Sequence, residues 1–112
     1  MKNILLVAHG SKVEETKQIV FKYFEDIKRK YPNTKLGFME FNTPSIDDAL
    51  KEFLNENVTK IYVLPLFLYE GNHIKKDIPE IISKYKINAT ILPPLLYDKR
   101  ISEILFERIE NL

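Results

Sequence analysis

The sequence predicts an α/β fold: one parallel sheet of four strands with helices on both faces. Two observations carry this prediction. Residues 4–8 form a continuous apolar run, typical of a strand buried on both faces, and residues 36–41, 60–68 and 87–92 are further strand candidates. After each of these segments, apolar residues recur at helical spacing. Strands that alternate with helices are joined by right-handed crossovers, which make the strands parallel and distribute the helices over both faces.

The first strand and the first helix have recognisable ends. Residues 4–8 form a uniformly apolar run, and Gly10 interrupts it. Ser11, with Glu14 three residues later, predicts a capping box at the start of the first helix. Pro32 follows the last apolar residue of this helix and ends it.

The second and third strands lie on either side of the second helix. Residues 36–41 form the second strand, and Thr43-Pro44-Ser45 predicts the helix start, because proline is favoured near the first helical position. Residues 60–68 are rich in β-branched and aromatic side chains. Pro65 lies inside this third strand although it cannot donate a ladder hydrogen bond. We interpret it as a bulge, or as a donor position that faces a loop, rather than as a device that shapes a site.

The last third of the chain predicts a helix, a strand and a final helix. Residues 72–85 have a helical pattern, but Pro79 makes the first turns irregular, because the residue before a proline avoids the helical region. Residues 87–92 form the fourth strand, and Asp98 caps the last helix. We predict the strand order 2-1-3-4, which places the topological switch point between the first and third strands.

The composition excludes several classes of function. The chain has 112 residues, enough for one modest core, so we expect residues 1–112 to form a single domain. Its 17 basic and 16 acidic side chains are interleaved, which predicts no binding to nucleic acid or to an anionic membrane. The absence of cysteine excludes disulfides, thiolate metal sites and cysteine nucleophiles. Residues 4–8 are too short for a signal sequence or a membrane span, so we expect a cytoplasmic protein.

Three side chains able to bind a metal ion follow three of the predicted strands. His9 ends the first strand, Glu40 lies near the end of the second, and His73 comes shortly after the third. Open parallel sheets bind ligands beyond the carboxyl ends of their strands. Two imidazoles and one carboxylate suit Co²⁺, Ni²⁺, Fe²⁺ or Zn²⁺, and an imidazole can also accept a proton near neutral pH. We therefore predict a metal site formed by all three side chains, with His9 and His73 catalytic.

Each of these residues also has a simpler interpretation when it is taken alone. A single histidine at a strand end is more often a hydrogen-bonding residue than a ligand, and Glu40 alone is typical of a surface carboxylate. Lys75 and Lys76 could bind substrate carboxylates, but they are equally typical of a solvated helix face. Convergence at one rim favours the metal site only if the strand order 2-1-3-4 is correct.

Several motifs in the chain occur in a familiar order and spacing. They are Leu5-Leu6-Val7-Ala8-His9-Gly10-Ser11, Phe38-Met39-Glu40 with Pro44-Ser45-Ile46, Val63-Leu64-Pro65-Leu66-Phe67-Leu68 with Gly71-Asn72-His73 and Asp77-Ile78-Pro79, and Pro93-Pro94-Leu95. The third block is the most specific, whereas the His-Gly pair alone is a weak signal. Together they resemble the short, CbiX-type sirohydrochlorin cobaltochelatases, which are class II chelatases.

The resemblance implies a chelatase-like domain that works as a homodimer enclosing a tetrapyrrole. It implies that His9 and His73 bind the metal and that Glu40 is the acidic residue that helps to hold it. The implied substrates are sirohydrochlorin and a divalent metal: cobalt first, then nickel, then iron. The reaction belongs to the biosynthesis of cobalamin or a related tetrapyrrole, and no cofactor beyond the substrate metal is expected.

The implied reaction suggests how further residues would be used. The macrocycle must lose two pyrrole N–H protons while the metal exchanges its ligands for four ring nitrogens, and either histidine would accept a proton. Apolar side chains near the rim would pack on the ring face: Leu66, Phe67, Leu68 and Leu95. Cations near the rim would orient the substrate carboxylates: Lys12, Lys75, Lys76 and Arg100.

Three alternatives remain open to different degrees. A nickel or iron chelatase of the same type would use the same ligands. A non-catalytic carrier of metal or tetrapyrrole would also use them, and turnover is what separates a carrier from an enzyme. A histidine phosphatase is disfavoured, because such enzymes have an arginine before the His-Gly pair, where this chain has Ala8.

Overall fold

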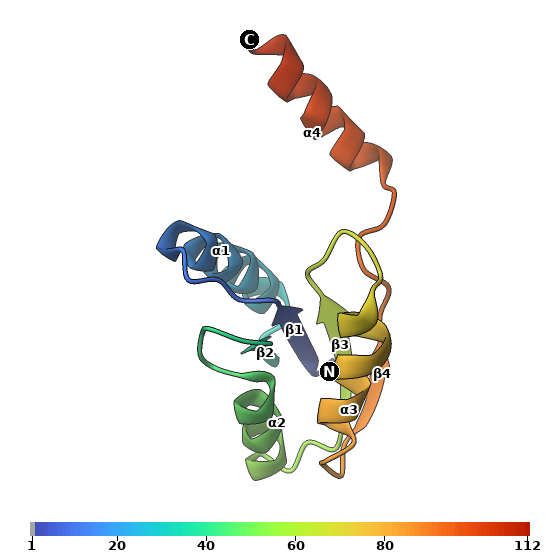
Figure 1. The fold of residues 1–112 in the computed structure, drawn as a ribbon. Coiled ribbons are helices and arrows are strands. Elements are labelled where there is room, and N and C mark those ends of the chain that lie inside the picture. Colours follow the sequence, from blue (N-terminus) through green and yellow to red (C-terminus); the bar gives the residue numbers. More distant parts are fainter. Residues whose placement is uncertain (1) are drawn as a thin grey trace.

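The structure is a computed structural model that describes residues 2–112, and it confirms the predicted α/β architecture (Figure 1). The strands are β1 (Ile4–Ala8), β2 (Thr34–Phe38), β3 (Lys60–Pro65) and β4 (Asn88–Ile91). They pair in parallel in the order β2-β1-β3-β4, as predicted. The helices are α1 (Glu14–Lys30), α2 (Ile46–Asn55), the π-helical segment η1 (His73–Asp77), α3 (Ile78–Ile82) and α4 (Lys99–Glu110). Within residues 2–112, no helix is both long enough and apolar enough to cross a membrane.

Strand β1 lies between two apolar layers, which explains its uninterrupted apolar sequence. Leu5 and Val7 pack on the face covered by α2 and α3. Leu6 and Ala8 point to the opposite face and pack with Val20 of α1. Every residue of β1 is therefore buried, as a central strand of a parallel sheet requires.

The predicted capping box at the start of α1 is wrong, whereas the start of α2 agrees with the sequence pattern. The Ser11 hydroxyl accepts the N–H of Val13 at 3.0 Å, and Glu14 pairs with Gln18 one turn later. Ser11 is held outside the helix because its own N–H donates to the side chain of Asn42, which lies beyond β2. At α2, Ser45 forms the reciprocal capping box with Asp48.

Strand β3 is shorter than predicted and ends at Pro65. Successive backbone N–H groups of β3 point alternately toward β1 and toward β4. The N–H of Leu66 donates to the Val7 carbonyl of β1 at 2.8 Å. The nitrogen of Pro65 therefore faces the other neighbour, β4, whose pairing with β3 has already ended at Val63 and Ile91. Pro65 therefore lies just past the last pair of the β3–β4 ladder, a position that agrees with a nitrogen facing a loop.

The predicted helix 72–85 forms in two shorter pieces. Its apolar side chains face the core, and Ile74, Ile78 and Ile82 are buried. The first piece is π-helical, however, and the N–H of Ile78 donates to the His73 carbonyl five residues back. Pro79 has no N–H with which to continue an α-helical ladder through this turn.

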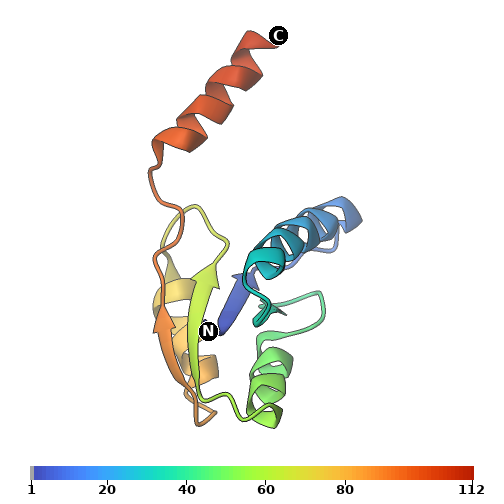
Figure 2. The ribbon, with the colours of Figure 1, turned by 180° about the vertical axis from the view of Figure 1, so that it is seen from behind.

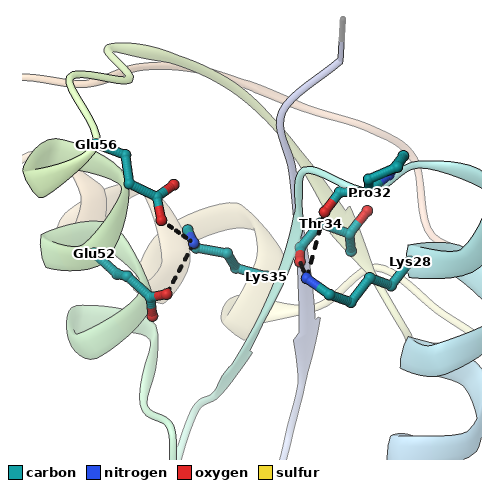
Figure 3. A network of polar contacts seen from close by, with 6 residues as sticks. All are labelled: Lys28, Pro32, Thr34, Lys35, Glu52 and Glu56. Atoms are coloured by element: carbon teal, nitrogen blue, oxygen red, sulfur yellow. Dashed lines mark hydrogen bonds and ion pairs between the residues drawn. The ribbon is translucent and has the colours of Figure 1, made fainter.

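A cluster of lysine contacts fixes the edge strand β2 (Figure 3). Lys35 donates to Glu52 and Glu56 of α2, each at 2.9 Å. Burial alone would lower the pKa of Lys35, but the two carboxylates outweigh it and raise the pKa above its usual value. On the other side, Lys28 donates to two carbonyl oxygens around the turn into β2, each at 3.3 Å.

Helix α4 forms as predicted but does not cover the sheet. Asp98 caps it by accepting the N–H of Arg100 at 2.9 Å. None of its residues is buried, and it extends away from the remaining elements (Figures 1 and 2). The molecule is consequently elongated, at 50 × 30 × 27 Å.

We expect Tyr85→Phe to lower the free energy of unfolding by about 1 kcal/mol, because it removes a hydrogen bond that joins the turn after α3 to α2. The Tyr85 hydroxyl donates to Asp47 at 2.6 Å. This bond lowers the pKa of Asp47 and raises that of Tyr85 to about 12. Urea unfolding at neutral pH measures the effect, and Tyr97→Phe is the control, since Tyr97 is 84% exposed.

The same pair predicts a pH dependence. A carboxyl whose pKa is depressed by folding stabilises the protein above its unfolded pKa, and this stabilisation is lost as the pH falls through the folded value. The difference between the wild type and Tyr85→Phe should therefore shrink below about pH 4. A difference that is constant between pH 7 and pH 3 would contradict the assigned contact.

Candidate metal centre

His9 and Glu40 meet where β1 and β2 end. Backbone pairing continues past both strands: the N–H of Met39 donates to Ala8 at 2.9 Å, and that of Glu40 donates to His9 at 3.0 Å. This pairing aligns the two side chains, and His9 Nε2 lies 2.5 Å from Glu40 Oε1. The two side chains are 41% and 51% exposed, so this pair lies open at the carboxyl rim of the sheet.

A close backbone contact holds the loops after β1 and β2 together. Gly10 has a φ of 103°, and a Cβ at this position would lie 1.8 Å from the Glu40 carbonyl oxygen. The N–H of Asn42 donates to the same oxygen at 2.8 Å. The Asn42 side chain accepts the N–H of Ser11 at 2.7 Å. Asn42 could not be identified from the sequence, because an asparagine in a loop is too common to be a signal by itself.

His73 reaches the same rim from the loop after β3. It is the first residue of η1, and its Nδ1 lies 3.1 Å from Asp77 Oδ2 one turn later. The ring centroids of His73 and His9 are 4.8 Å apart in an edge-to-face arrangement. Phe67 stacks on His73 with a centroid distance of 6.4 Å. Single turns of π-helix are frequent at functional sites, and this one places the histidine.

Asp77, like Asn42, has a place in the site that was not predicted from the sequence. A metal-binding histidine usually donates its other ring N–H to a carboxylate or carbonyl, which fixes the ring and its tautomer. Asp77 is placed to do this for His73, since the contact uses Nδ1 and leaves Nε2 for a ligand. The signal was present in the sequence, because positions four apart share one helix face.

The three predicted ligands, His9, Glu40 and His73, contact one another only in pairs. Glu40 contacts His9, and His9 contacts His73. Residues 2–112 nevertheless contain no group of three or more His, Asp or Glu side chains already arranged to hold a metal ion. Each histidine instead shares a hydrogen bond with a carboxylate. A metal ion that binds His9 Nε2 would replace the hydrogen bond to Glu40 and leave that carboxylate beside the ion.

A hollow of about 170 Å³ adjoins His9. Its lining is mostly apolar and includes Ala8, Val20, Phe38, Leu66 and Phe67, with His9 and Asn42 at its edge. Sites for drug-sized ligands occupy about 300–1,000 Å³. A macrocycle would therefore have to lie across the open rim rather than inside this hollow.

The other predicted substrate residues lie at varying distances from the histidines. Leu68 and Leu95 are exposed on two loops joined by the hydrogen bond from the Leu95 N–H to the Phe67 carbonyl, at 2.9 Å. Lys12 lies over the ring of Phe41, beside Glu40 in sequence, with 5.2 Å from Nζ to the centroid. Lys75 pairs with Glu70 at 3.9 Å, Arg100 pairs with Asp98, and Lys76 is exposed on η1. Their roles toward a substrate stay predictions.

We expect Asp77→Asn to weaken Co²⁺ binding about 10- to 100-fold, because loss of a carboxylate partner disorients the histidine and lowers its basicity. Titration with Co²⁺, followed by its visible absorption, measures the affinity. Glu80→Gln is the matched control, since it makes the same change of charge on the next helix. Equal affinities for the two variants would remove Asp77 from the site.

The fold and the site together define a class: an open parallel α/β protein with a pair of imidazoles at its switch point, flanked by carboxylates and an apolar rim. The CbiX family model matches residues 3–112. The chain belongs to the CbiX family.

Relatives of known name agree with this assignment. A protein of Sulfolobus acidocaldarius named sirohydrochlorin cobaltochelatase is 41% identical over 113 residues, covering 99% of this chain and 92% of the relative. A CbiX protein from Marinobacter aquaeolei has a similar structure, with a TM-score of 0.82, 26% identity and coverage of 97% of this chain and 98% of that one. The sirohydrochlorin chelatase SirB from Bacillus subtilis subspecies spizizenii, solved in complex with cobalt, gives a TM-score of 0.89 at 30% identity. The match covers all of this chain but 51% of SirB.

Proposed function

We propose that this chain is a sirohydrochlorin cobaltochelatase, an enzyme that inserts Co²⁺ into the tetrapyrrole sirohydrochlorin. The observation that carries the proposal is the contact between His9 and His73 at the open rim, in a chain that belongs to the CbiX family over residues 3–112. The full-length relative from Sulfolobus acidocaldarius has this name, and SirB was solved with cobalt.

The proposed mechanism gives the two histidines related but different tasks. His73, oriented by Asp77, presents one ring nitrogen to the incoming Co²⁺. His9 accepts one pyrrole proton, and Glu40, at 2.5 Å, stabilises the imidazolium that results, while the second pyrrole proton passes to solvent at the open rim. A small mixed set of nitrogen and oxygen ligands leaves positions open on the ion, so four ring nitrogens can replace the protein ligands stepwise.

We propose that the working unit is a homodimer. The side chains of His9, Glu40 and His73 are between 41% and 51% exposed, so one copy offers a single wall to a flat macrocycle. The hollow beside them is too small to enclose one. This chain matches about half of SirB, so two copies would supply the amount of protein that SirB carries in one chain.

We assign cobalt as the physiological metal on the names of the relatives, with nickel and iron as competitors that ligand chemistry alone does not separate. The reaction requires no nucleotide or organic cofactor in this proposal. The cytoplasm remains our expected location.

The test is an anaerobic spectrophotometric assay of the purified protein with excess sirohydrochlorin and Co²⁺, Ni²⁺ or Fe²⁺. We expect many turnovers per protein and a rate with Co²⁺ well above the spontaneous one. Stoichiometric binding of metal or tetrapyrrole without accelerated metallation would replace the enzyme with a carrier. If metallation were accelerated with Ni²⁺ or Fe²⁺ but not with Co²⁺, the protein would still be a chelatase, but the assignment of cobalt would be wrong.

A further inference from the structure

The loop between β2 and α2 holds a large apolar side chain on a strained backbone. The N–H of Asn42 donates to the Glu40 carbonyl two residues back, at 2.8 Å, and closes a three-residue turn around Phe41. Phe41 has a φ of 68°, which belongs to the rare and strained form of this turn. A positive φ is uncommon for any residue with a side chain and exceptional for a bulky one. The residue directly after Glu40 is therefore a point of backbone strain.

Within residues 2–112, the two other residues with a positive φ, glycine apart, have structural explanations. Asn57, with a φ of 61°, follows the last turn of α2, and asparagine is one of the residues that adopt this conformation after a helix. Leu96, with a φ of 55°, donates its N–H to the Leu68 carbonyl and shares an apolar hollow with the first turns of α4. Phe41 has no comparable apolar surroundings, because it is 57% exposed.

The turn itself does not require a phenylalanine. Glycine adopts a positive φ without steric cost and would still let the Asn42 N–H reach the Glu40 carbonyl. A phenylalanine adds strain and leaves much of its ring in water, so the fold alone gains little from it. Residues with strained backbone conformations cluster at sites that bind or transform a ligand. Phe41 is therefore better explained by a ligand at the rim than by the fold.

A cation from the neighbouring loop lies on the Phe41 ring. Lys12 follows β1, and its Nζ is 5.2 Å from the ring centroid. No carboxylate among residues 2–112 pairs with this ammonium. The contact leaves the second face of the ring and the charge of Lys12 free to meet a ligand. A flat apolar ligand that carries carboxylates at its edge matches both groups.

Phe41 and Lys12 belong to the same rim as the metal centre. Glu40, whose carboxylate contacts His9, directly precedes Phe41. Gly10 packs against the Glu40 carbonyl oxygen, the same oxygen that closes the strained turn. A ligand on the Phe41 ring would therefore lie beside the side chains that bind the metal in the proposed reaction.

We propose that Phe41 and Lys12 bind the tetrapyrrole: the free face of the Phe41 ring stacks on the macrocycle, and the Lys12 ammonium pairs with a carboxylate at its edge. This inference rests on the proposed function and adds a contact with the substrate that does not depend on the metal. The strained turn fixes the backbone that carries the ring, so less conformational freedom is lost when the macrocycle binds. Phe41 is thus a substrate-binding residue beside the metal ligands.

The test is titration of the full chain with metal-free sirohydrochlorin under anaerobic conditions, followed by the absorbance of the macrocycle. Asparagine tolerates a positive φ, so Phe41→Asn removes the ring and keeps the turn. We expect its dissociation constant for sirohydrochlorin to be at least about 10-fold above that of the wild type. Its Co²⁺ affinity and its urea midpoint should not fall. Phe41→Tyr, which retains the ring, should bind as the wild type does.

Two further variants complete the comparison. Tyr23→Ala removes an aromatic side chain of similar exposure, 52%, from the middle of α1, and should bind sirohydrochlorin as the wild type does. Lys12→Met keeps the length of the side chain and removes its charge. We expect it to weaken binding about 5-fold, the upper range for an exposed ion pair. Added salt should weaken the binding of Lys12→Met less than that of the wild type.

The outcomes separate this contact from the proposed enzyme. Wild-type affinity for sirohydrochlorin in Phe41→Asn would overturn the inference and leave the chelatase standing. If Phe41→Asn lost Co²⁺ affinity and stability together with sirohydrochlorin affinity, Phe41 would hold the loop rather than the substrate, and the inference would again be overturned. A wild type that binds no sirohydrochlorin would overturn the inference together with the proposed function.

Discussion

His9→Ala and His73→Ala are each expected to lower kcat/KM for cobalt insertion by at least about 100-fold, the usual effect of losing a general base or a metal ligand. The two rings are in contact at 4.8 Å, so one variant removes half of a shared site. The double variant should therefore lose little more activity than the worse single variant. Steady-state metallation of sirohydrochlorin under anaerobic conditions measures all three.

The control for these variants is their stability. Both side chains are nearly half exposed, so neither substitution opens a cavity in the core. Urea midpoints should stay close to that of the wild type, and Glu80→Ala, an exposed position of α3 with no predicted role, should keep normal turnover. Full activity in either histidine variant would reduce that residue to a hydrogen-bonding role.

Gly10→Ala is expected to lower the free energy of unfolding by about 3 kcal/mol, since it combines an unfavourable positive φ with a steric overlap. The new Cβ would lie 1.8 Å from the Glu40 carbonyl oxygen, and backbone at this contact cannot move aside as a side-chain tip would. The loops after β1 and β2 would separate, so cobalt turnover should fall as well.

Gly71→Ala is the matched control for this prediction. A Cβ at position 71 meets nothing within 4 Å, and the change should alter stability by less than about 1 kcal/mol. Urea unfolding of both variants, together with the metallation assay, provides the comparison. If Gly10→Ala were as stable and as active as Gly71→Ala, Gly10 would not be packed against the Glu40 carbonyl oxygen.

The fold was predictable because its periodic signals are strong and consistent. Residues 4–8 are apolar on both sides since β1 is buried between two helix layers. The start of α2 at Thr43-Pro44-Ser45 was predictable because its signals lie within one turn, although the capping box of Ser45 with Asp48 was not predicted. The cap at Ser11 was misread because a tertiary contact, from the Ser11 N–H to Asn42, takes that residue out of the helix. Such a contact is invisible in a local pattern.

The part of the candidate site that depends on strand order could be predicted from the sequence. His9, Glu40 and His73 follow strands that the order 2-1-3-4 makes neighbours, and the structure brings them to one rim. Asn42 was not assigned because its role depends on loop geometry, whereas Asp77 was missed although it lies four residues after His73, on the same helix face. The position of α4 could not be predicted either, because an apolar stripe does not show where a helix lies, and no residue of α4 is buried.

The most direct measurement of the central claim is the location of cobalt by anomalous X-ray scattering in crystals grown with Co²⁺. The account predicts an anomalous peak at about 2.0–2.2 Å from a ring nitrogen of His9 or His73, with Glu40 beside it. The peak should be lost in His9→Ala or His73→Ala crystals. Cobalt bound elsewhere, with the two histidines still paired to Glu40 and Asp77, would contradict the claim that this rim delivers the metal.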